Sequence, residues 1–314
     1  MQVYFAPLEG ITDHIYRQLH HRYFPGINKY FTPFFSPTVH RSLTPKEARE
    51  LPQADTLHYT LVPQILTNHP ENFLWMAQQS ADLGYQEINL NLGCPSGTVT
   101  AKKKGSGMLQ DTEALCRFLD AIFHGSPIDI SLKTRIGFSQ PEEFPKLLEI
   151  YNRYPVKELI IHPRTRSTFY NGAPDMDAFT YAIQNAKAPI CYNGNLCSAT
   201  DIENLCNTFP QVQSVMLGRG LIGDPGMLSD QTQYTSLLQD FYSALLEEYI
   251  KAFGGSRNAM FRLKENWRYL ICRFQNTDKL AKRLRKTTDI QEYKAIVNEI
   301  FMTCPLQDTL YPDW

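Results

Sequence analysis

A cysteine flanked by a glycine and a proline is the first position in this sequence that could carry chemistry. Cys94 follows Gly93 and precedes Pro95, just after the apolar run Glu87–Leu92. Glycine and proline both tend to end a strand, so we expect the thiol in the loop that follows the strand. A free thiol is mostly protonated near neutral pH and can act as a nucleophile or as a proton donor. A lone cysteine is also compatible with a small core residue.

Two cations and a histidine lie at the ends of other apolar runs. Lys133 ends the run Ile128–Lys133, and Arg135 follows on the same side of the extended chain. A buried lysine is costly without an anionic partner, which favours a ligand-binding role over a side chain that merely reaches the rim. His162 ends the run Glu158–His162 and is compatible with either a ligand contact or a structural histidine.

Two glycine-rich turns and a basic loop are candidates for contacts with phosphate. Asn193-Gly194-Asn195 and Gly218-Arg219-Gly220 each follow an apolar run. Backbone N–H groups in such turns bind anions, and Arg219 adds charge, although either turn alone is compatible with an ordinary connection. The segment Thr98–Gly107 is compatible with a mobile lid that meets phosphate or with a solvated loop, and it holds Lys102, Lys103 and Lys104.

Eight short apolar runs alternate with amphipathic segments over the first 240 residues. The predicted strands are Val3–Ala6, Lys29–Phe35, Leu61–Leu66, Glu87–Leu92, Ile128–Lys133, Glu158–His162, Pro189–Tyr192 and Ser214–Leu217. The predicted helices between them are Pro70–Leu83, Asp111–Phe123, Pro141–Tyr151, Asp175–Asn185 and Thr200–Asn207, with Asn68 and Asp111 as candidate N-caps. This alternation predicts an α/β fold, a (β/α)₈ TIM barrel, and disfavours a doubly wound sheet, since no GxGxxG follows the first run.

The pattern changes after Gly226, where four helices follow without strands. They are predicted at Gln231–Ala252, Phe261–Phe274, Leu280–Lys286 and Asp289–Met302. We therefore expect a barrel domain over 1–240 and a small all-helical domain over 241–314. The chain has a net charge of −1, but residues 251–286 hold 11 basic residues against Glu265 and Asp278. Such a block is either a solvated helical face or a patch that binds phosphates.

Composition excludes several classes of protein. With 314 residues, 43% hydrophobic and 20% charged, the chain is neither disordered nor a collagen nor a coiled coil. It has no apolar stretch long enough to span a membrane, and Met1–Pro7 lacks the features of a secretory signal. Seven cysteines without a CxxC pair predict free thiols in a reducing compartment and no zinc site. We expect a cytoplasmic monomer without a metal.

The strand ends together resemble those of the tRNA-dihydrouridine synthase family. The similarity runs in order over roughly residues 1–226, and the loop around Cys94 is its most specific part. In the helical part, Lys264–Leu270 is similar to a Lys/Trp-bearing helix of the bacterial class C type. The matching segments are Ala6–Asp13, Val62–Gln64, Asn89–Pro95, Gly107–Leu109, Leu132–Arg135, Ile161–Arg166, Tyr170–Gly172, Asn193–Asn195 and Val215–Gly220.

The resemblance implies FMN at the barrel mouth, NADPH or NADH as the reductant and tRNA as the substrate. Cys94 would be the catalytic proton donor. The implied flavin-binding residues are Pro7, Leu8, Glu9, Gln64, Lys133 and His162, with Asn193, Gly194, Asn195, Gly218 and Arg219 at the phosphate. The implied uracil contacts are Asn91 and Arg135, and tRNA would meet Lys102, Lys103, Lys104, Lys264, Arg268, Arg283 and Arg285.

The expected reaction adds a hydride from reduced FMN to C6 of uridine and a proton from the Cys94 thiol to C5. Because the target base lies within folded tRNA, it must be turned out into the pocket. The chain departs from the family in having Ala173–Met176 after Tyr170–Gly172, and Asp224–Met227 after the second phosphate turn. These departures concern packing at the edge of the flavin and the subclass.

Two other functions are compatible with parts of this pattern. The first is an FMN-dependent barrel oxidoreductase of a free small molecule, similar to dihydropyrimidine or dihydroorotate dehydrogenases or to ene-reductases. The basic helical tail and Lys102–Lys104 argue against it, since a small substrate needs neither. The second is a non-catalytic tRNA-binding protein that keeps the barrel as a scaffold. The intact Cys94 and phosphate turns argue against that.

Overall fold

The computed structural model describes residues 1–229 and 232–307. Its core is one nine-stranded sheet in the order β3-β2-β1-β9-β8-β7-β6-β5-β4. The pairs with a described register are all parallel. The strands are β1 Gln2–Phe5, β2 Lys29–Phe31, β3 Leu61–Val62, β4 Gln64–Ile65, β5 Glu87–Leu92, β6 Asp129–Arg135, β7 Leu159–His162, β8 Ile190–Tyr192 and β9 Ser214–Leu217.

The sheet forms a barrel because one predicted strand supplies both of its ends. The run Leu61–Leu66 divides at Pro63 into β3, which pairs with β2, and β4, which pairs with β5. Proline has no N–H to donate, so the ladder is interrupted there, although the Pro63 carbonyl still accepts from Asn89 N–H at 2.8 Å. The predicted (β/α)₈ TIM barrel is therefore confirmed, with nine short strands in place of the eight expected.

Two strand boundaries differ from the prediction. β2 ends at Phe31, not at Phe35, and Pro33 lies in the segment without regular structure that follows. β6 continues past Lys133 to Arg135, which pairs with His162 of β7. The polar residues Lys133 and Arg135 thus both belong to the strand and to the same face of it.

The barrel helices begin and end largely as the sequence indicates. Asp111 caps α5 by accepting from Ala114 N–H, and Gly84, with φ of +86°, follows the end of α3. Asn68 does not cap α3; the N-cap is His69, and the Asn68 amide donates to the Lys102 carbonyl instead. The helices are α3 Pro70–Asp82, α5 Thr112–Gly125, α6 Phe144–Tyr151, α7 Met176–Asn185 and α8 Ala199–Thr208.

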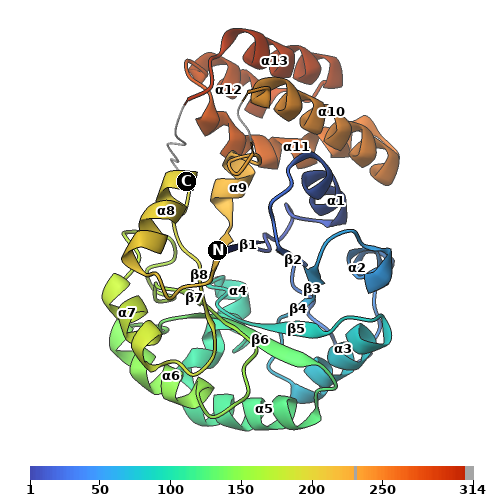
Figure 1. Cartoon of the computed structure of the whole chain (residues 1–314). Helices are drawn as coiled ribbons and strands as arrows, with labels where there is room; N and C mark the ends of the chain where they lie inside the picture. Colours follow the sequence, from blue (N-terminus) through green and yellow to red (C-terminus); the bar gives the residue numbers. More distant parts are fainter. Residues whose placement is uncertain (230–231, 308–314) are drawn as a thin grey trace. The chain divides into compact units, whose positions relative to one another are not determined.

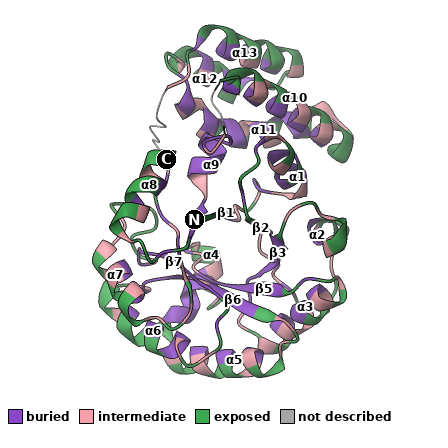
Figure 2. Cartoon of the chain, viewed as in Figure 1, coloured by how far each residue is buried: buried purple, intermediate pink, exposed green. Residues whose placement is uncertain are grey.

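Four α-helices were not expected from the sequence: α1 His14–Tyr23, α2 Pro45–Glu50, the single turn α4 Gly97–Thr100 and α9 Arg219–Gly223. α1 is capped by Asp13, which accepts from Tyr16 N–H. Figure 1 shows α3, α5, α6 and α7 around the outside of the strands. In Figure 2, β5 and β6 are almost entirely buried, whereas these helices present an exposed side. The strands thus supply side chains to the barrel interior.

The chain divides into two compact units. Unit 1 comprises residues 1–7, 28–195 and 205–216, and unit 2 comprises residues 8–27, 196–204 and 217–314. Unit 2 holds α1, α9 Arg219–Gly223, α10 Tyr234–Phe253, α11 Ser256–Leu270, α12 Asp278–Lys286 and α13 Ile290–Thr303. The predicted boundary at residue 240 falls inside α10, so the functional division into 1–240 and 241–314 stays a prediction.

The helices of unit 2 pack around a buried tryptophan. Trp267 of α11 is 1% exposed, and its indole N–H donates to the Tyr293 hydroxyl of α13 at 3.0 Å. The predicted helix Phe261–Phe274 starts earlier, at Ser256, and gives way to a 3₁₀ turn at Ile271–Arg273. The predicted break at 254–256 is confirmed, because Gly254 ends α10 in the left-handed region. The predicted start of α10 at Gln231 lies outside the described residues.

Candidate active site

The turn that carries Cys94 is held by the asparagine at the end of β5. Asn91 Oδ1 accepts from the N–H groups of Gly93 and Cys94, at 3.0 and 2.9 Å. The Cys94 carbonyl accepts from Ser106 Oγ at 2.7 Å. Gly105 packs so closely that a Cβ there would lie 3.0 Å from that of Cys94. The thiol, half-buried, therefore sits on a turn fixed from both sides.

A chain of amide side chains connects this turn to neighbouring strands. Asn91 Nδ2 donates to Gln64 Oε1 at 2.8 Å, and Gln64 Nε2 donates to Asn89 Oδ1 at 2.8 Å. Asn89 Nδ2 in turn donates to Ser131 Oγ at 2.9 Å. All four residues are buried, so each amide is oriented by its neighbours. Asn89 and Ser131 were not predicted, although the alternation of Glu87, Asn89 and Asn91 in one strand marks a polar inward face.

Lys133 contributes an ammonium group to the same interior. It pairs in register with Asn91 across β5 and β6. Burial, and next the nearby Arg135, lower the pKa of Lys133 to about 8. Within the described ranges, no hydrogen bond or ion pair of this ammonium is found. An unmatched cation in a barrel interior is compatible with an anionic or acceptor ligand, and the ligand role expected for Lys133 stays a prediction.

The side chain of Arg135 is held by hydrogen bonds to backbone carbonyls. Its side chain is 1% exposed, and Nε donates to the Gly93 carbonyl at 2.9 Å. Nη1 donates to the carbonyls of Thr165 and Phe169, at 2.8 and 2.6 Å. This guanidinium therefore joins the Cys94 turn to the loop after β7. Its predicted contact with uracil stays a prediction.

His162 is oriented by an arginine that the sequence did not single out. Nη1 of Arg164 lies 3.0 Å from Nε2 of His162. A guanidinium can only donate, so Nε2 accepts and the imidazole carries its proton on Nδ1. Arg164 is itself buried and donates to the Asn171 and Gly172 carbonyls. The only sequence signal for this pair was its spacing, two residues apart at a strand end.

The two glycine-rich turns lie in different units. In unit 1, Asn193 Nδ2 donates to the Met216 carbonyl at 2.7 Å, and Asn195 has φ of +37°. Gly194 is packed so that a Cβ would lie 3.1 Å from the Tyr192 hydroxyl oxygen. In unit 2, a Cβ on Gly220 would lie 2.2 Å from the Leu196 carbonyl oxygen, while Gly218 and Arg219 begin α9. Both turns thus have the close backbone packing that glycine allows.

The predicted flavin contacts nearest the N-terminus, Pro7, Leu8 and Glu9, are also divided between the two units. Pro7 ends a segment of unit 1, whereas Leu8 and Glu9 begin a segment of unit 2. The Leu8 carbonyl accepts from the N–H groups of Ile11 and Thr12, both at 3.0 Å. Unit 1 by itself brings together Cys94, Asn91, Gln64, Lys133, Arg135 and His162.

The basic loop of unit 1 carries both exposed and anchored lysines. Lys102 and Lys103 are exposed, whereas Lys104 Nζ donates to Ser36 Oγ at 3.2 Å. Burial, and next the charge of Lys102, lower the pKa of Lys104. Two of the three predicted tRNA contacts here thus present free ammonium groups to solvent.

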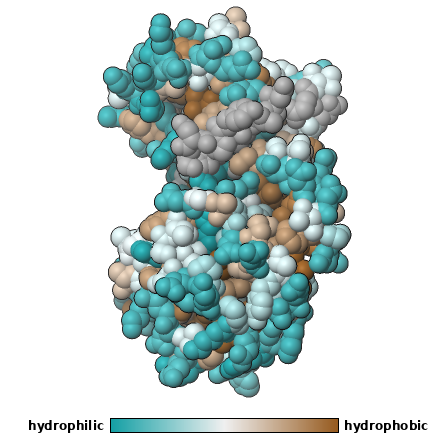
Figure 3. All heavy atoms as spheres, turned by 90° about the vertical axis from the view of Figure 1, so that its left-hand side faces the viewer, coloured by the Kyte–Doolittle hydropathy of each residue, from teal (hydrophilic) through white to brown (hydrophobic). Residues whose placement is uncertain are grey.

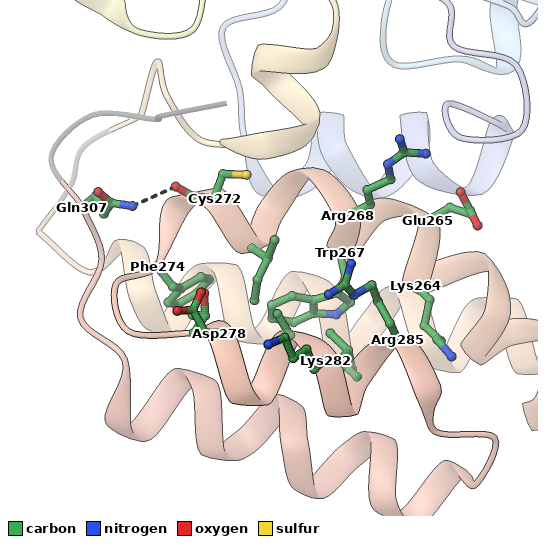
Figure 4. A pocket seen from close by; sticks show the side chains of 14 residues that line it. Lys264, Glu265, Trp267, Arg268, Cys272, Phe274, Asp278, Lys282, Arg285 and Gln307 are labelled. Carbon is green, nitrogen blue, oxygen red and sulfur yellow. Dashed lines mark hydrogen bonds between the residues drawn. The ribbon is translucent and has the colours of Figure 1, made fainter. Parts of the chain in front are cut away.

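A basic pocket of about 800 Å³ lies between α11 and α12 of unit 2. Figure 4 shows Trp267 and Phe274 in it, with Lys264, Lys282 and Arg285 around them. Arg268 and Arg285 are exposed, but Lys264 Nζ donates to the Thr287 carbonyl at 2.8 Å. Arg283 lies outside the pocket lining and pairs with Glu299 at 3.1 Å. Of the four cations of unit 2 that are predicted to meet tRNA, Arg268 and Arg285 are therefore the most available.

In the part of the chain that the structure describes, no group of three His, Cys, Asp or Glu residues could hold a metal ion. No helix among those residues is both long and apolar enough to cross a membrane. Hydrophilic residues cover most of the face drawn in Figure 3.

A family model and several named relatives with related descriptions match this chain. A family model described as dihydrouridine synthase matches residues 4–303. The tRNA-dihydrouridine synthase B of Proteus vulgaris is 28% identical over 233 residues, covering 73% of this chain and 70% of its own. A probable tRNA-dihydrouridine synthase 1 of Synechocystis is 22% identical over 315 residues, covering 96% of this chain and 86% of its own.

Solved structures with the same fold are more distant. Morphinone reductase in complex with tetrahydroNAD has a TM-score of 0.50 and 11% identity, covering 72% of this chain and 85% of its own. Histamine dehydrogenase from Rhizobium has a TM-score of 0.54 and 11% identity, covering 77% of this chain and 46% of its own. At such identity these similarities concern the fold alone.

Proposed function

This chain belongs to the dihydrouridine synthase family, and we propose that it reduces specific uridines in tRNA to 5,6-dihydrouridine. The observation that carries the proposal is the fixed turn of Cys94 next to the unmatched ammonium of Lys133, inside one barrel. A half-buried thiol on the turn after β5 and a cation on the adjacent strand β6 would provide a proton donor and an anion site. The named relatives supply the substrate class.

Cys94 is the proton donor in this proposal. The C5=C6 bond of uracil is conjugated with the C4 carbonyl, so addition of hydride at C6 places negative charge on C5 and O4. A neutral thiol can then protonate C5. The hydrogen bonds from the Gly93 and Cys94 N–H groups to Asn91 fix the backbone of this residue, so its thiol needs little reorganisation to reach the base.

The residues of unit 1 fit a flavin. The unmatched Lys133 ammonium suits an electron-rich ring edge, and His162, at the end of the neighbouring strand β7, would contact the ring system or the ribityl chain. Gln64 would contact the ring system, and the turn Asn193–Asn195 would hold the phosphate of FMN. When bound and reduced by NADPH, the flavin supplies the hydride.

The basic face of unit 2 is the proposed binding surface for tRNA. Its exposed cations Arg268 and Arg285 attract phosphates without regard to sequence. Lys102 and Lys103 of unit 1 would add charge near the Cys94 turn. Recognition of folded RNA by shape and by phosphate contacts suits such a surface.

A cofactor and activity assay tests this function. The purified protein should show flavin absorbance and release FMN on denaturation. With NADPH it should form dihydrouridine in tRNA that was transcribed without modifications. Colourless protein that cannot be reconstituted with FMN would refute the proposal. Reduction of a free pyrimidine but not of tRNA would favour a small-molecule oxidoreductase.

A further inference from the structure

The guanidinium of Arg166, in the loop after β7, lies over two aromatic rings. Its central carbon lies 5.2 Å from the centre of the Phe138 ring and 5.0 Å from that of Phe169. Nη2 approaches Thr100 Oγ1 at a long 3.5 Å, and Nε is buried with no partner among the described residues. Stacking thus fixes the plane of this cation while leaving most of its donors unused.

Phe169 is an unusual neighbour for that cation. It has φ of +52°, in the left-handed region that bulky residues avoid, and 38% of its surface is exposed. Its carbonyl accepts from Arg135 Nη1 at 2.6 Å, and its N–H donates to the Arg166 carbonyl at 3.1 Å. The loop therefore holds an apolar ring partly in solvent, on a backbone conformation that bulky residues rarely adopt.

This loop is joined directly to the Cys94 turn. Arg135, which binds the Phe169 carbonyl, also donates to the Gly93 carbonyl at 2.9 Å. On the other side, Arg166 reaches Thr100, in the segment whose Gly105 packs on Cys94. Both sets of contacts, the one through Arg135 and the one through Arg166, lie within unit 1. The loop therefore lies beside the turn to which a target base would be delivered.

The charge of the surroundings favours a polyanion. The segments 98–107 and 163–172 contain no acidic residue, and they carry Lys102, Lys103 and Arg166. A planar guanidinium with unused donors binds a phosphodiester well, and an exposed aromatic ring accepts a stacked base. The two chemistries together match a nucleotide unit of single-stranded RNA.

We propose that Arg166 and Phe169 form a binding site, here called the rim site, for the nucleotide next to the target uridine. Arg166 binds the phosphodiester, and the exposed ring of Phe169 stacks on the base or sugar of that nucleotide. This inference rests on the proposed function, because it takes RNA as the substrate. It adds a means of holding the target base out of its stack, since a neighbour stacked on Phe169 no longer stacks on the target.

Binding of a short RNA tests the rim site. The probe is a fluorescently labelled five-nucleotide RNA with a central uridine, titrated against the flavin-loaded protein. Phe169→Leu should weaken its binding about tenfold, whereas Phe169→Tyr should keep the wild-type affinity. Arg166→Gln should weaken binding by a similar factor and reduce the slope of log affinity against log salt by about 0.7. Flavin content reports whether each variant has folded.

Two matched controls lie on the same unit. Tyr181 of α7 is also 38% exposed, and Arg153 pairs with Glu149 on the surface. Tyr181→Leu and Arg153→Gln should leave binding and activity unchanged. Wild-type binding by Phe169→Leu, or an unchanged salt slope in Arg166→Gln, would overturn the inference. A raised KM for NADPH with unchanged RNA binding would also overturn it and assign the site to the dinucleotide.

The outcomes separate this inference from the proposed function. If the wild-type protein reduces uridine in tRNA while the rim-site variants bind RNA normally, only the inference fails. If the wild-type protein contains no flavin and forms no dihydrouridine, the proposed function itself fails.

Discussion

Asn91 Oδ1 accepts a hydrogen bond from the backbone N–H of Cys94 at 2.9 Å. The last polar residue of β5 thus determines the conformation of the turn that carries the thiol. Asn91 is oriented in turn by Gln64 of β4, 2.8 Å from its Nδ2 atom. The position of the candidate proton donor therefore depends on two adjacent strands, and its neighbours can be changed without touching the sulfur.

Loss of the Asn91 side chain should slow the reaction more than it affects folding. Asn91→Ala leaves the N–H groups of Gly93 and Cys94 without their acceptor, so the thiol is less well placed. We expect dihydrouridine formation to slow by about 10- to 100-fold in single-turnover assays, with the flavin retained. Asn152→Ala removes a comparable amide, which bonds the Asn185 carbonyl and Lys187 N–H on the surface, and should not change the rate. Equal rates for the two variants would contradict a positioning role.

Replacement of the thiol should separate the two half-reactions. Cys94→Ala should still bind FMN and oxidise NADPH, but lose reduction of uridine, since no proton donor remains for C5. Stopped-flow absorbance of the flavin and analysis of nucleosides from tRNA measure the two steps. Full reduction of uridine by this variant would exclude Cys94 as the donor.

Flavin affinity should depend on the charge of Lys133. Burial and Arg135 lower the pKa of this lysine to about 8, so its ammonium loses the proton as pH rises through that value. A flavin that prefers the charged form should bind less tightly at pH 9 than at pH 7, by up to about tenfold. Lys133→Met should bind FMN weakly at both pH values, as measured by quenching of flavin fluorescence. The same pH slope in that variant would mean that another group is responsible.

The charged face of unit 2 should contribute unequally to tRNA binding. Arg268→Glu and Arg285→Glu should weaken binding and flatten its dependence on salt, because both side chains are exposed. Arg283→Glu should have less effect, since Glu299 already neutralises that arginine. Gel-shift titrations at several salt concentrations measure the slope. An unchanged slope in the first two variants would identify the block 251–286 as a solvated face.

The N-terminal end of the barrel should matter for stability and not for chemistry. Lys29 Nζ bonds Glu87 at 2.9 Å and Glu158 at 3.3 Å, and all three side chains are largely buried. Lys29→Ala leaves two carboxylates uncompensated, at a cost of about 3 kcal/mol in the free energy of unfolding. Lys157→Ala breaks an exposed pair with Asp129 and should cost less than about 1 kcal/mol. Urea denaturation compares them, and similar losses would contradict this explanation.

The sequence by itself determined the barrel and the position of Cys94 at a strand end. Buried parallel strands require short apolar runs, and helices require periodic ones, so their alternation is visible without coordinates. Glycine and proline mark the end of β5 for the same local reason, namely their backbone restrictions. The basic block over residues 251–286 is likewise a matter of composition.

Only the tertiary structure decided what the polar side chains bind. The resemblance implies a contact of Arg135 with uracil, which stays a prediction, whereas the structure shows that its partners include the carbonyls of Gly93, Thr165 and Phe169. Every residue type has a backbone carbonyl, so the residue types do not show which carbonyl will accept a hydrogen bond. These carbonyls belong to loops up to 42 residues from Arg135 in the sequence. Such pairs form because strand register and barrel closure bring the loop ends together, and the local pattern of residues does not encode either.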